Sequence, residues 1–281
     1  MIFFFNKGRL GNQLFHFAFL MGIRNAGEAM CVIGMHELFE LLDTRECLCW
    51  HFDRYPFRML FGKLLATLAR LRIISTIGLL KTAAPSRHLP PVITRKGVFS
   101  AIRFVRADYF QSEQYLPINY KEQLTVRAEH VAKARACLAQ FPAECKLVFV
   151  HVRRGDYLTE KYAGIQGLAL PPEYYHQAIA LVRSRLENPC FIVLSDDIPY
   201  CQQLFAAYSD FHYSKNPPAV DFAIMTLCYA GIISNSSYSW WGSKLAPDIR
   251  LILSPRYWFG WRSKITYPPF IQAEDFIQVD F

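Results

Sequence analysis

The second half of the chain alternates short apolar runs with segments of helical spacing, and this alternation constrains the fold more than any other feature. Four runs have the length of strands: Leu147–Val152, Phe191–Leu194, Gly231–Ser234 and Leu251–Ser254. Helical segments lie between them, at Pro172–Leu186, from Pro199 onward, at Asp221–Ala230 and at Tyr238–Leu245. Strands that are apolar throughout are buried on both faces, as in a parallel sheet covered by helices. The pattern therefore predicts an α/β fold built on a parallel sheet.

The first half of the chain begins with the same kind of unit. A strand, a glycine-containing loop, a helix and a second strand are predicted at Ile2–Phe5, Asn6–Gln13, Leu14–Asn25 and Cys31–Gly34. Residues 36–130 give a mixed pattern, and a helix predicted at Leu124–Gln140 ends before Pro142. A length of 281 residues allows one or two domains of this kind.

Two adjacent arginines, Arg153 and Arg154, follow the strand Leu147–Val152. Ligands of parallel α/β sheets bind at the carboxyl ends of the strands. Arginine presents a planar, permanently charged fork that can hold a diphosphate through two hydrogen bonds at once. We therefore predict a phosphate site here. The alternative is a structural pair in which Asp156 neutralises an arginine.

A run of small polar residues, Ser234–Ser237, lies between a strand and the helix Tyr238–Leu245. Free backbone N–H groups and the positive end of the helix dipole make such a position an anion site. Serine and asparagine are also good helix caps, so capping alone is the alternative interpretation. The arginines at a neighbouring strand end favour the phosphate interpretation.

Two carboxylates, Asp196 and Asp197, follow the strand Phe191–Leu194. They would suit a metal-bound nucleotide, hydrogen bonds to a base or ribose, or a helix cap ahead of Pro199. Because arginines are available for the phosphates, we expect no metal at this site.

The amino-terminal loop contains Gly8, Gly11 and Asn12. Its glycines would let a ligand approach the backbone closely. The spacing is not GxGxxG, and no acidic residue ends the following strand, so a dinucleotide-binding fold is not indicated.

The formal net charge is +8, from 31 Lys and Arg against 23 Asp and Glu. This charge predicts an anionic partner, either a phosphorylated small molecule or a membrane surface. The cations are scattered, so no nucleic acid is expected as a partner. The apolar stretch Met59–Leu80 contains Lys63, Arg70 and Arg72, which argues against a membrane-spanning helix. It predicts a basic amphipathic helix that packs on the core or lies on a membrane surface.

The eight cysteines form no CxxC pair, and no Cys/His set has zinc-finger spacing. Cys190 and Cys228 lie in apolar runs, where a reduced cysteine is an ordinary core residue. The amino terminus has no signal-peptide pattern. We expect reduced thiols in a cytoplasmic protein, with at most peripheral contact with the inner face of the membrane.

At four stretches the sequence resembles the bacterial α-1,2-fucosyltransferases of glycosyltransferase family 11. It is also similar to the wider group that contains α-1,6- and protein O-fucosyltransferases. The stretches follow the family's order: GRLGNQLF at 8–15, HVRRGDY at 151–157, SDD at 195–197 and SNSSYSWWG at 234–242. Residues 36–130 match no motif of the family.

The resemblance implies a GT-B-like fold of two Rossmann-type domains with parallel sheets and a cleft between them. Residues 1–140 would form the acceptor-side domain and residues 141–281 the domain that binds GDP-fucose. The reaction would invert the anomeric carbon without metal or other cofactor. The acceptor would be a terminal β-galactoside, on an oligosaccharide or a glycolipid, and the product an α-1,2 link.

The resemblance also implies roles for single residues. Arg153 would hold the β-phosphate and stabilise the departing GDP. Asp156 or Asp196 would meet the guanosine. Apart from the resemblance, Asp156 is the first candidate for the base of the acceptor hydroxyl, because it is a carboxylate near the phosphate site, and orienting the arginines is its alternative role. The remaining implied donor-binding residues are Gly11, Asn12, His151, Arg154, Asp197, Asn235, Ser236, Ser237 and Tyr238.

Three other classes of protein remain as alternatives. A non-catalytic module for nucleotide sugars or glycans would bind GDP without turnover. A nucleic-acid-binding protein is suggested only by the charge and lacks a recognised motif. A nicotinamide-dependent oxidoreductase is disfavoured by the missing glycine fingerprint.

Overall fold

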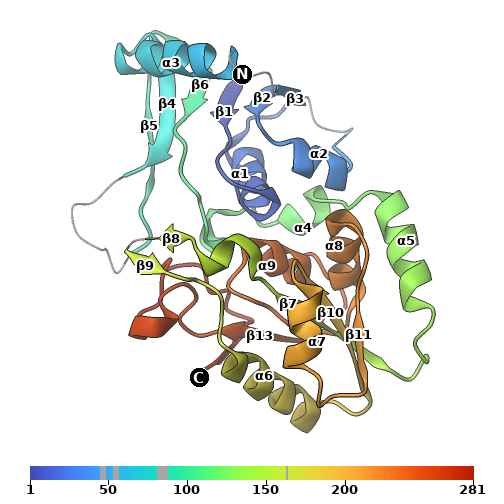
Figure 1. Ribbon diagram of the computed structural model, residues 1–281. Helices are drawn as coiled ribbons and strands as arrows, with labels where there is room; N and C mark the ends of the chain where they lie inside the picture. The colour runs from blue at the N-terminus through green and yellow to red at the C-terminus, as the bar shows by residue number, and fades with distance from the viewer. Residues whose placement is uncertain (45–48, 53–56, 81–87, 163) are drawn as a thin grey trace. The chain divides into compact units, whose positions relative to one another are not determined.

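The computed structural model describes residues 1–44, 49–52, 57–80, 88–162 and 164–281. The chain divides into two compact units, Met1–Thr125 and Val126–Phe281. Each unit is of α/β type and has its own six-stranded sheet (Figure 1). This is the predicted GT-B-like class, with two Rossmann-type units built on parallel strands.

In the second unit the strands lie in the order β11-β10-β7-β12-β13-β14, and all neighbours are parallel. The strands are β7 (Lys146–Val152), β10 (Pro189–Ser195), β11 (Phe211–Tyr213), β12 (Ala230–Ile232), β13 (Leu251–Pro255) and β14 (Ile277–Val279). The helices are α5 (Ala128–Leu138), α6 (Pro172–Arg185), α7 (Ile198–Leu204), α8 (Pro218–Leu227) and α9 (Ser237–Lys244). Short elements complete the unit: η2 (Gly155–Leu158), the antiparallel pair β8 (Lys161–Tyr162) and β9 (Ile165–Gln166), and η3 (Trp261–Ser263).

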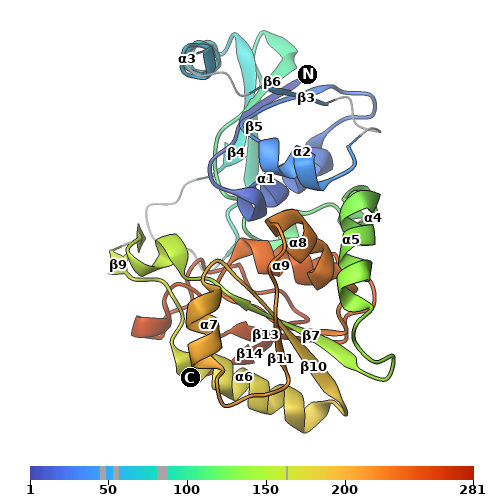
Figure 2. The ribbon, with the colours of Figure 1, turned by 45° about the vertical axis from the view of Figure 1, so that its right-hand side comes forward.

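Strand β7 shows why the apolar runs do not alternate with polar residues. Val148, Val150 and Val152 are buried in a cluster with side chains of α6 and α7. On the other face, the ring of His151 lies 5.3 Å from that of Tyr238 on α9. Helices therefore cover both faces of the sheet, and Figure 2 shows α6 and α9 on opposite sides of it.

In the first unit the strand order is β3-β2-β1-β6-β4-β5, and only the edge pair β4–β5 is antiparallel. The strands are β1 (Ile2–Phe5), β2 (Met30–Ile33), β3 (Cys49–Phe52), β4 (Ile74–Leu79), β5 (Val92–Arg95) and β6 (Phe99–Val105). The helices are α1 (Leu10–Ile23), α2 (His36–Leu41), α3 (Phe57–Arg70), α4 (Tyr120–Gln123) and the short η1 (Glu113–Tyr115).

Residues of β1 alternate between the two helical layers of this unit. The ring of Phe4 lies 4.8 Å from that of His16 on α1. Phe3 and Phe5 contact Phe61 of α3, with ring centroids 5.6 Å and 6.1 Å apart. Alternate strand residues point to opposite faces, so α1 and α3 cover opposite sides of β1.

Helix α1 begins at Leu10, earlier than the predicted start at Leu14. Leu10, Leu14 and Phe17 are all buried, so the apolar helical spacing extends back into the predicted loop. The turn before the helix is made at Gly8, whose φ of +94° favours glycine. The predicted loop at residues 6–13 is therefore wrong in its second half, and Gly11 and Asn12 lie in the first turn of α1.

The sequence predicted one helix over Met59–Leu80, and this prediction is wrong. Helix α3 ends at Arg70, Arg72 adopts a left-handed φ of 57°, and residues Ile74–Leu79 form β4. The β-branched residues of this segment favour a strand, and it pairs with β6 inside the sheet. In the described part of the chain no helix has the length and apolar character needed to cross a membrane.

The division between the two compact units falls between Thr125 and Val126 in the chain, whereas the sequence analysis places the domain boundary at 140/141. Helix α5 accounts for the difference. It packs against α8, a helix of the second unit, and so belongs with that unit. The sequence pattern shows where this helix ends but not which sheet it packs on.

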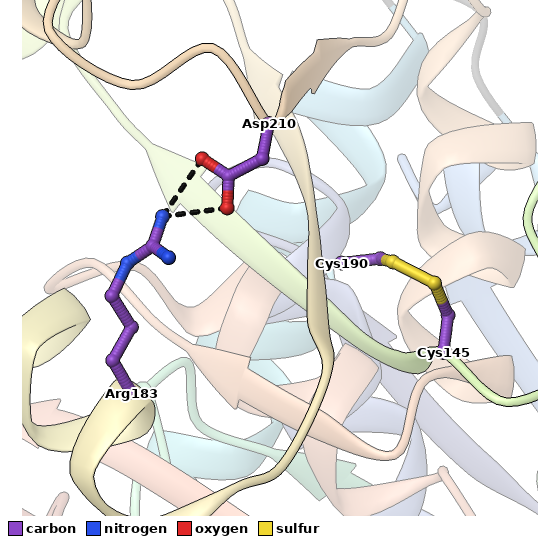
Figure 3. The surroundings of a disulfide bond; sticks show 4 residues. All are labelled: Cys145, Arg183, Cys190 and Asp210. Atoms are coloured by element: carbon purple, nitrogen blue, oxygen red, sulfur yellow. Dashed lines mark hydrogen bonds and ion pairs between the residues drawn. A yellow bond between two sulfur atoms is a disulfide. The ribbon is translucent and has the colours of Figure 1, made fainter.

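Cys145 and Cys190 form a disulfide, which corrects the expected reduced state of Cys190 (Figure 3). Cys145 precedes β7 and Cys190 lies on the neighbouring strand β10, with 5.7 Å between their Cα atoms. This distance is ordinary for a disulfide. Strand pairing brings together residues 45 positions apart, which cysteine spacing alone could not show. Cys228 is a buried free thiol, as expected.

Candidate functional site

The polar clusters of the second unit lie at one edge of its sheet. Strand β7 stands between β10 and β12. Val152 pairs with Ser195, and Val150 pairs with Ile232. The loops after these three strands are therefore neighbours at the carboxyl edge, as the sequence predicted.

Arg153 lies between two carboxylates. One guanidinium nitrogen donates to Asp156 Oδ1 at 2.5 Å, and another lies 2.8 Å from Asp196 Oδ2. The guanidinium also stands 5.4 Å from the ring centroid of Tyr157. Only 18% of the Arg153 side chain is exposed, so these contacts hold the fork in one orientation.

Arg154 is fixed by the other carboxylate of this cluster. Its Nε donates to Asp197 Oδ2 at 3.1 Å, and its guanidinium lies 3.4 Å from the ring centroid of Tyr200. Its backbone N–H donates to Asp196 Oδ1 at 2.9 Å, so Asp196 ties the β7 loop to the β10 loop. Both arginines are thus paired with carboxylates, as the alternative interpretation from the sequence expected. Their guanidinium groups still lie at the carboxyl end of β7.

Close approach of the two loops depends on Gly155. A Cβ at this position would lie 2.6 Å from Asp196 Oδ2, closer than such atoms pack. Any side chain at residue 155 would therefore move Asp196 away from Arg153. This is a physical reason for glycine between the arginine pair and Asp156.

His151 is buried and supports the next loop. Its Nδ1 lies 2.8 Å from Ser234 Oγ, within hydrogen-bonding distance. Burial, together with the charge of Arg153, lowers the pKa of His151 to about 3. The ring is therefore neutral at physiological pH, and its place in this structure is behind the arginines rather than beside a solvent-exposed ligand.

The loop Ser234–Ser237 begins α9 with a cap. Ser236 Oγ accepts from the backbone N–H of Tyr238 at 3.4 Å, which is the capping role expected as the alternative. Asn235 is buried, and its Nδ2 donates to the carbonyl of Leu168 at 2.7 Å. Its Oδ1 has no hydrogen-bond partner among the described residues. Capping does not remove the helix dipole, so the amino end of α9 still favours an anion.

Tyr238 is held from the other side of the loop. Its hydroxyl donates to the carbonyl of Pro218 at 2.5 Å, and burial raises its pKa well above the ordinary value. The hydroxyl is thus already engaged in the structure. Its backbone N–H is engaged as well, by Ser236 Oγ, so a ligand that accepts from Tyr238 has to displace one of these two contacts.

Asp197 also serves as the cap of α7, accepting from the backbone N–H of Tyr200 at 3.2 Å. Asp196 and Asp197 are therefore both committed to protein contacts. Within the described ranges, no three His, Cys, Asp or Glu side chains are grouped as a metal-ligand set would be.

The amino-terminal motif lies in the first unit and is built at the carboxyl end of β1. Asn12 Oδ1 accepts from Gln111 Nε2 at 2.8 Å. Asn6 Oδ1 lies 2.8 Å from Nδ1 of the buried His16, and Gln13 Oε1 accepts from the backbone N–H of Leu38. Gln13 and His16 therefore organise the loop and the start of α1, while Gly11 and Asn12 lie in its first turn.

Asp221, on α8, is a residue that the sequence did not single out. Its Oδ1 accepts from Ser214 Oγ at 2.5 Å, and Ser214 directly follows β11 at the same sheet edge. Burial raises the pKa of Asp221 to about 6. The sequence places Asp221 only at the start of a helix, where aspartate is common, so no local signal marked its burial.

Comparison with known proteins adds a family. Residues 88–257 match the family model described as Glycosyl transferase family 11. The chain is 35% identical over 120 residues to the O-antigen biosynthesis glycosyltransferase WbnK of Escherichia coli, which covers 41% of this chain and 40% of that protein. It is 37% identical over 119 residues to an Alpha-1,2-colitosyltransferase of Escherichia coli, covering 40% of this chain and 41% of that protein.

A mammalian relative matches a share of this chain close to that matched by the two bacterial proteins. The chain is 33% identical over 104 residues to Galactoside alpha-(1,2)-fucosyltransferase 2 of Pongo pygmaeus, covering 35% of this chain and 30% of that protein. The matched segments thus span less than half the length of these curated relatives. Among solved structures, NodZ alpha-1,6-fucosyltransferase crystallised with GDP superposes with a TM-score of 0.52 at 11% identity, over 88% of this chain and 92% of that one. This likeness shows the fold.

The raised pKa of Asp221 predicts a pH-dependent stability. The folded value of about 6 lies above the ordinary 3.8, so the folded state binds more protons between these values. Stability contributed by the neutral carboxyl is therefore present below pH 4 and is lost as the pH rises through 6. We expect Asp221→Asn to raise the free energy of unfolding at pH 8 by about 1–3 kcal/mol and to leave it unchanged near pH 4.

Urea unfolding at the two pH values, followed by circular dichroism, measures this difference. Asp210→Asn is the matched control, because the Asp210 side chain is 40% exposed and paired with Arg183, so this substitution should not raise the free energy of unfolding at pH 8. An Asp221→Asn variant that is no more stable than the parent at pH 8 would contradict the assignment.

Proposed function

Because the chain belongs to glycosyl transferase family 11, we propose that it transfers L-fucose from GDP-β-L-fucose to a β-galactoside. The link formed would be α-1,2, with inversion at the anomeric carbon and without a metal. One observation carries the proposal. Arg153 and Arg154 lie at the carboxyl end of β7, next to the amino end of α9, and this juxtaposition suits a diphosphate.

The main requirement of the reaction is to stabilise the negative charge that develops on the departing GDP. Cleavage of the fucosyl–phosphate bond passes through an oxocarbenium-like transition state, as in glycoside hydrolysis, and leaves negative charge on GDP. Fixed donors aimed at that charge stabilise the transition state. Arg153 is the proposed main donor, and Ser236 and Ser237 at the start of α9 supply further N–H groups. Metal independence follows as a proposal, because these donors meet the charge that a metal would otherwise meet.

The carboxylates would exchange partners when the donor binds. Asp156 is half exposed and pairs with Arg153. A diphosphate that takes over the fork of Arg153 releases Asp156, which is then a carboxylate close to the reacting centre. We assign Asp156 as the base for the acceptor hydroxyl. Asp196, which contacts both arginines, is the proposed ligand of the guanosine. Asn12 is proposed to contact the donor as well.

The identity of the transferred sugar rests on the family and is tested directly. An acceptor β-galactoside incubated with GDP-fucose should gain the mass of one deoxyhexose. The NMR coupling of the new anomeric proton should indicate an α link, and a correlation from that proton across the glycosidic bond to C2 of galactose should indicate attachment at O2. A GDP-activated colitose serves as the rival donor, because one relative is named as a colitosyltransferase. Transfer of colitose but not fucose would keep the fold and family and replace the donor. GDP binding without any transfer would support the non-catalytic module.

Arg153→Lys should keep the charge and lose most of the activity, because lysine cannot form the two-pronged contact with phosphate. Losing one such donor typically costs about a hundred- to a thousandfold in rate. The measurement is the initial rate of transfer at saturating donor. Arg183→Lys is the matched control, since Arg183 donates to both oxygens of Asp210 at 2.7 Å and 2.6 Å outside the site (Figure 3). Near-parental turnover in Arg153→Lys would remove Arg153 from its proposed role.

Asp156→Asn distinguishes a base from an orienter. If Asp156 accepts the proton, kcat should fall by about a hundredfold or more while the Kd for GDP stays within a few-fold of the parent. Isothermal titration with GDP and steady-state rates measure the two quantities. If GDP affinity falls in step with kcat, Asp156 acts by holding Arg153 and the base lies elsewhere.

A further inference from the structure

The excess of positive over negative charge comes from one segment of the first unit, although the cations themselves are spread along the chain. Residues 54–107 contain eleven Lys and Arg and no Asp or Glu. The whole chain has 31 cations and 23 anions, so the remainder has 20 cations, 23 anions and a net charge of −3. This segment therefore carries all of the excess positive charge, and the question is which surface displays it.

Helix α3 displays an apolar stripe on its outer side. Phe61 faces β1, and Leu65 is buried at 5% exposure. Leu60, Leu64 and Leu71 are 69%, 53% and 60% exposed. Their spacing of four and seven residues places them on one side of a helical path. Figure 2, in which α3 is seen nearly end-on, shows no other helix over this outer side.

The start of β6 extends the stripe. Val98 and Phe99 are 81% and 61% exposed. The backbone N–H of Val98 donates to the carbonyl of Arg72, and that of Phe99 to the carbonyl of Ile73, at 2.9 Å and 2.8 Å. These bonds place Val98 and Phe99 beside the residues that follow the end of α3 at Arg70, and we include their exposed side chains in the same surface. We call these five exposed residues, with their surrounding cations, the α3 face.

The cations of the α3 face are all exposed: Lys63, Arg70, Arg72, Arg95 and Lys96. None of them forms an ion pair within the described part of the chain. Large exposed apolar side chains bordered by lysine and arginine are typical of surfaces that lie in the interface of an anionic bilayer. The apolar side chains enter between the lipids, and the cations remain at the level of the headgroups.

We propose that the α3 face binds the surface of a membrane containing anionic lipids. A second copy of the chain is disfavoured as the partner, since it would bring the same unpaired cations together. Nucleic acid would use the cations but not the leucines, valine and phenylalanine between them. The inference goes beyond the proposed transfer reaction and does not depend on it.

Flotation with lipid vesicles tests the proposal on the full chain. One set of vesicles is pure phosphatidylcholine, and the other has a one-third share of phosphatidylglycerol. We expect binding to the anionic set only, and weaker binding at high salt. A charge variant with Arg70→Gln, Arg72→Gln and Lys96→Gln should bind roughly a hundredfold more weakly, since each cation near the surface contributes about a factor of five. An apolar variant with Leu60→Ser and Leu64→Ser should bind at least tenfold more weakly.

Matched variants control for charge and polarity. Lys133→Gln, Arg135→Gln and Arg185→Gln remove the same number of exposed cations from the second unit, and Ile118→Ser with Ile265→Ser remove exposed apolar side chains elsewhere. Both controls should bind like the parent. Circular dichroism and GDP affinity, unchanged in all four variants, show that each is folded.

Four results would overturn the inference. The first is equal binding to neutral and anionic vesicles, or none to either, by the parent chain. The second is an equal loss of binding in the matched controls. The third is salt-sensitive binding to a short DNA duplex that Leu60→Ser and Leu64→Ser leave intact, which would assign the face to nucleic acid. Self-association without lipid that the same two substitutions abolish would assign it to a second copy.

Discussion

The contact of Arg153 with Asp196 is the interaction on which the rest of the candidate site depends. Asp196 directly follows β10 and reaches the loop after β7, where it contacts the Arg153 side chain and the Arg154 backbone. Parallel pairing of β7 with β10 puts the two loops side by side, and Gly155 leaves the space for them to meet. The two arginines and the three carboxylates Asp156, Asp196 and Asp197 thus hold one another in place, with one negative charge in excess. An incoming diphosphate has to take the place of a carboxylate, and the half-exposed Asp156 is the one most accessible to exchange.

Much of this arrangement could be predicted from the sequence, because it is local in origin. A continuous apolar strand followed by Arg153 and Arg154 indicates both the parallel sheet and the position of its ligand edge. The same holds for Asp196 and for the loop before α9. The order in which the strands pair then brings these local features together, and the parallel α/β class limits that order to few arrangements.

The remainder depends on contacts between distant segments. Cys145 and Cys190 meet because β7 and β10 are neighbours, and Asp221 is partly buried because α8 packs beside the loop after β11. The spacing of residues along the sequence predicts neither the disulfide nor the environment of Asp221. The failure at Met59–Leu80 has a different cause. Apolar content is shared by helices and buried strands, so hydrophobicity alone could not separate α3 from β4.

Charge is used in two ways along this chain. At the carboxyl edge of the second unit, each arginine is held by carboxylates and by an aromatic ring, which fixes its direction. On the α3 face the cations are exposed and border apolar side chains, so they present charge without fixed geometry. The first arrangement suits a small anion bound in one orientation, and the second suits an extended anionic surface.

The central claim is that the arginine cluster supports transfer from a GDP-sugar without a metal. Release of GDP from GDP-fucose, measured with and without lactose in buffer containing EDTA, tests it most directly. GDP-mannose and UDP-galactose are the donor controls. The account predicts release that requires lactose, continues in EDTA and is specific for GDP-fucose. The absence of turnover with any GDP-sugar and any acceptor, together with no binding of GDP, would contradict it.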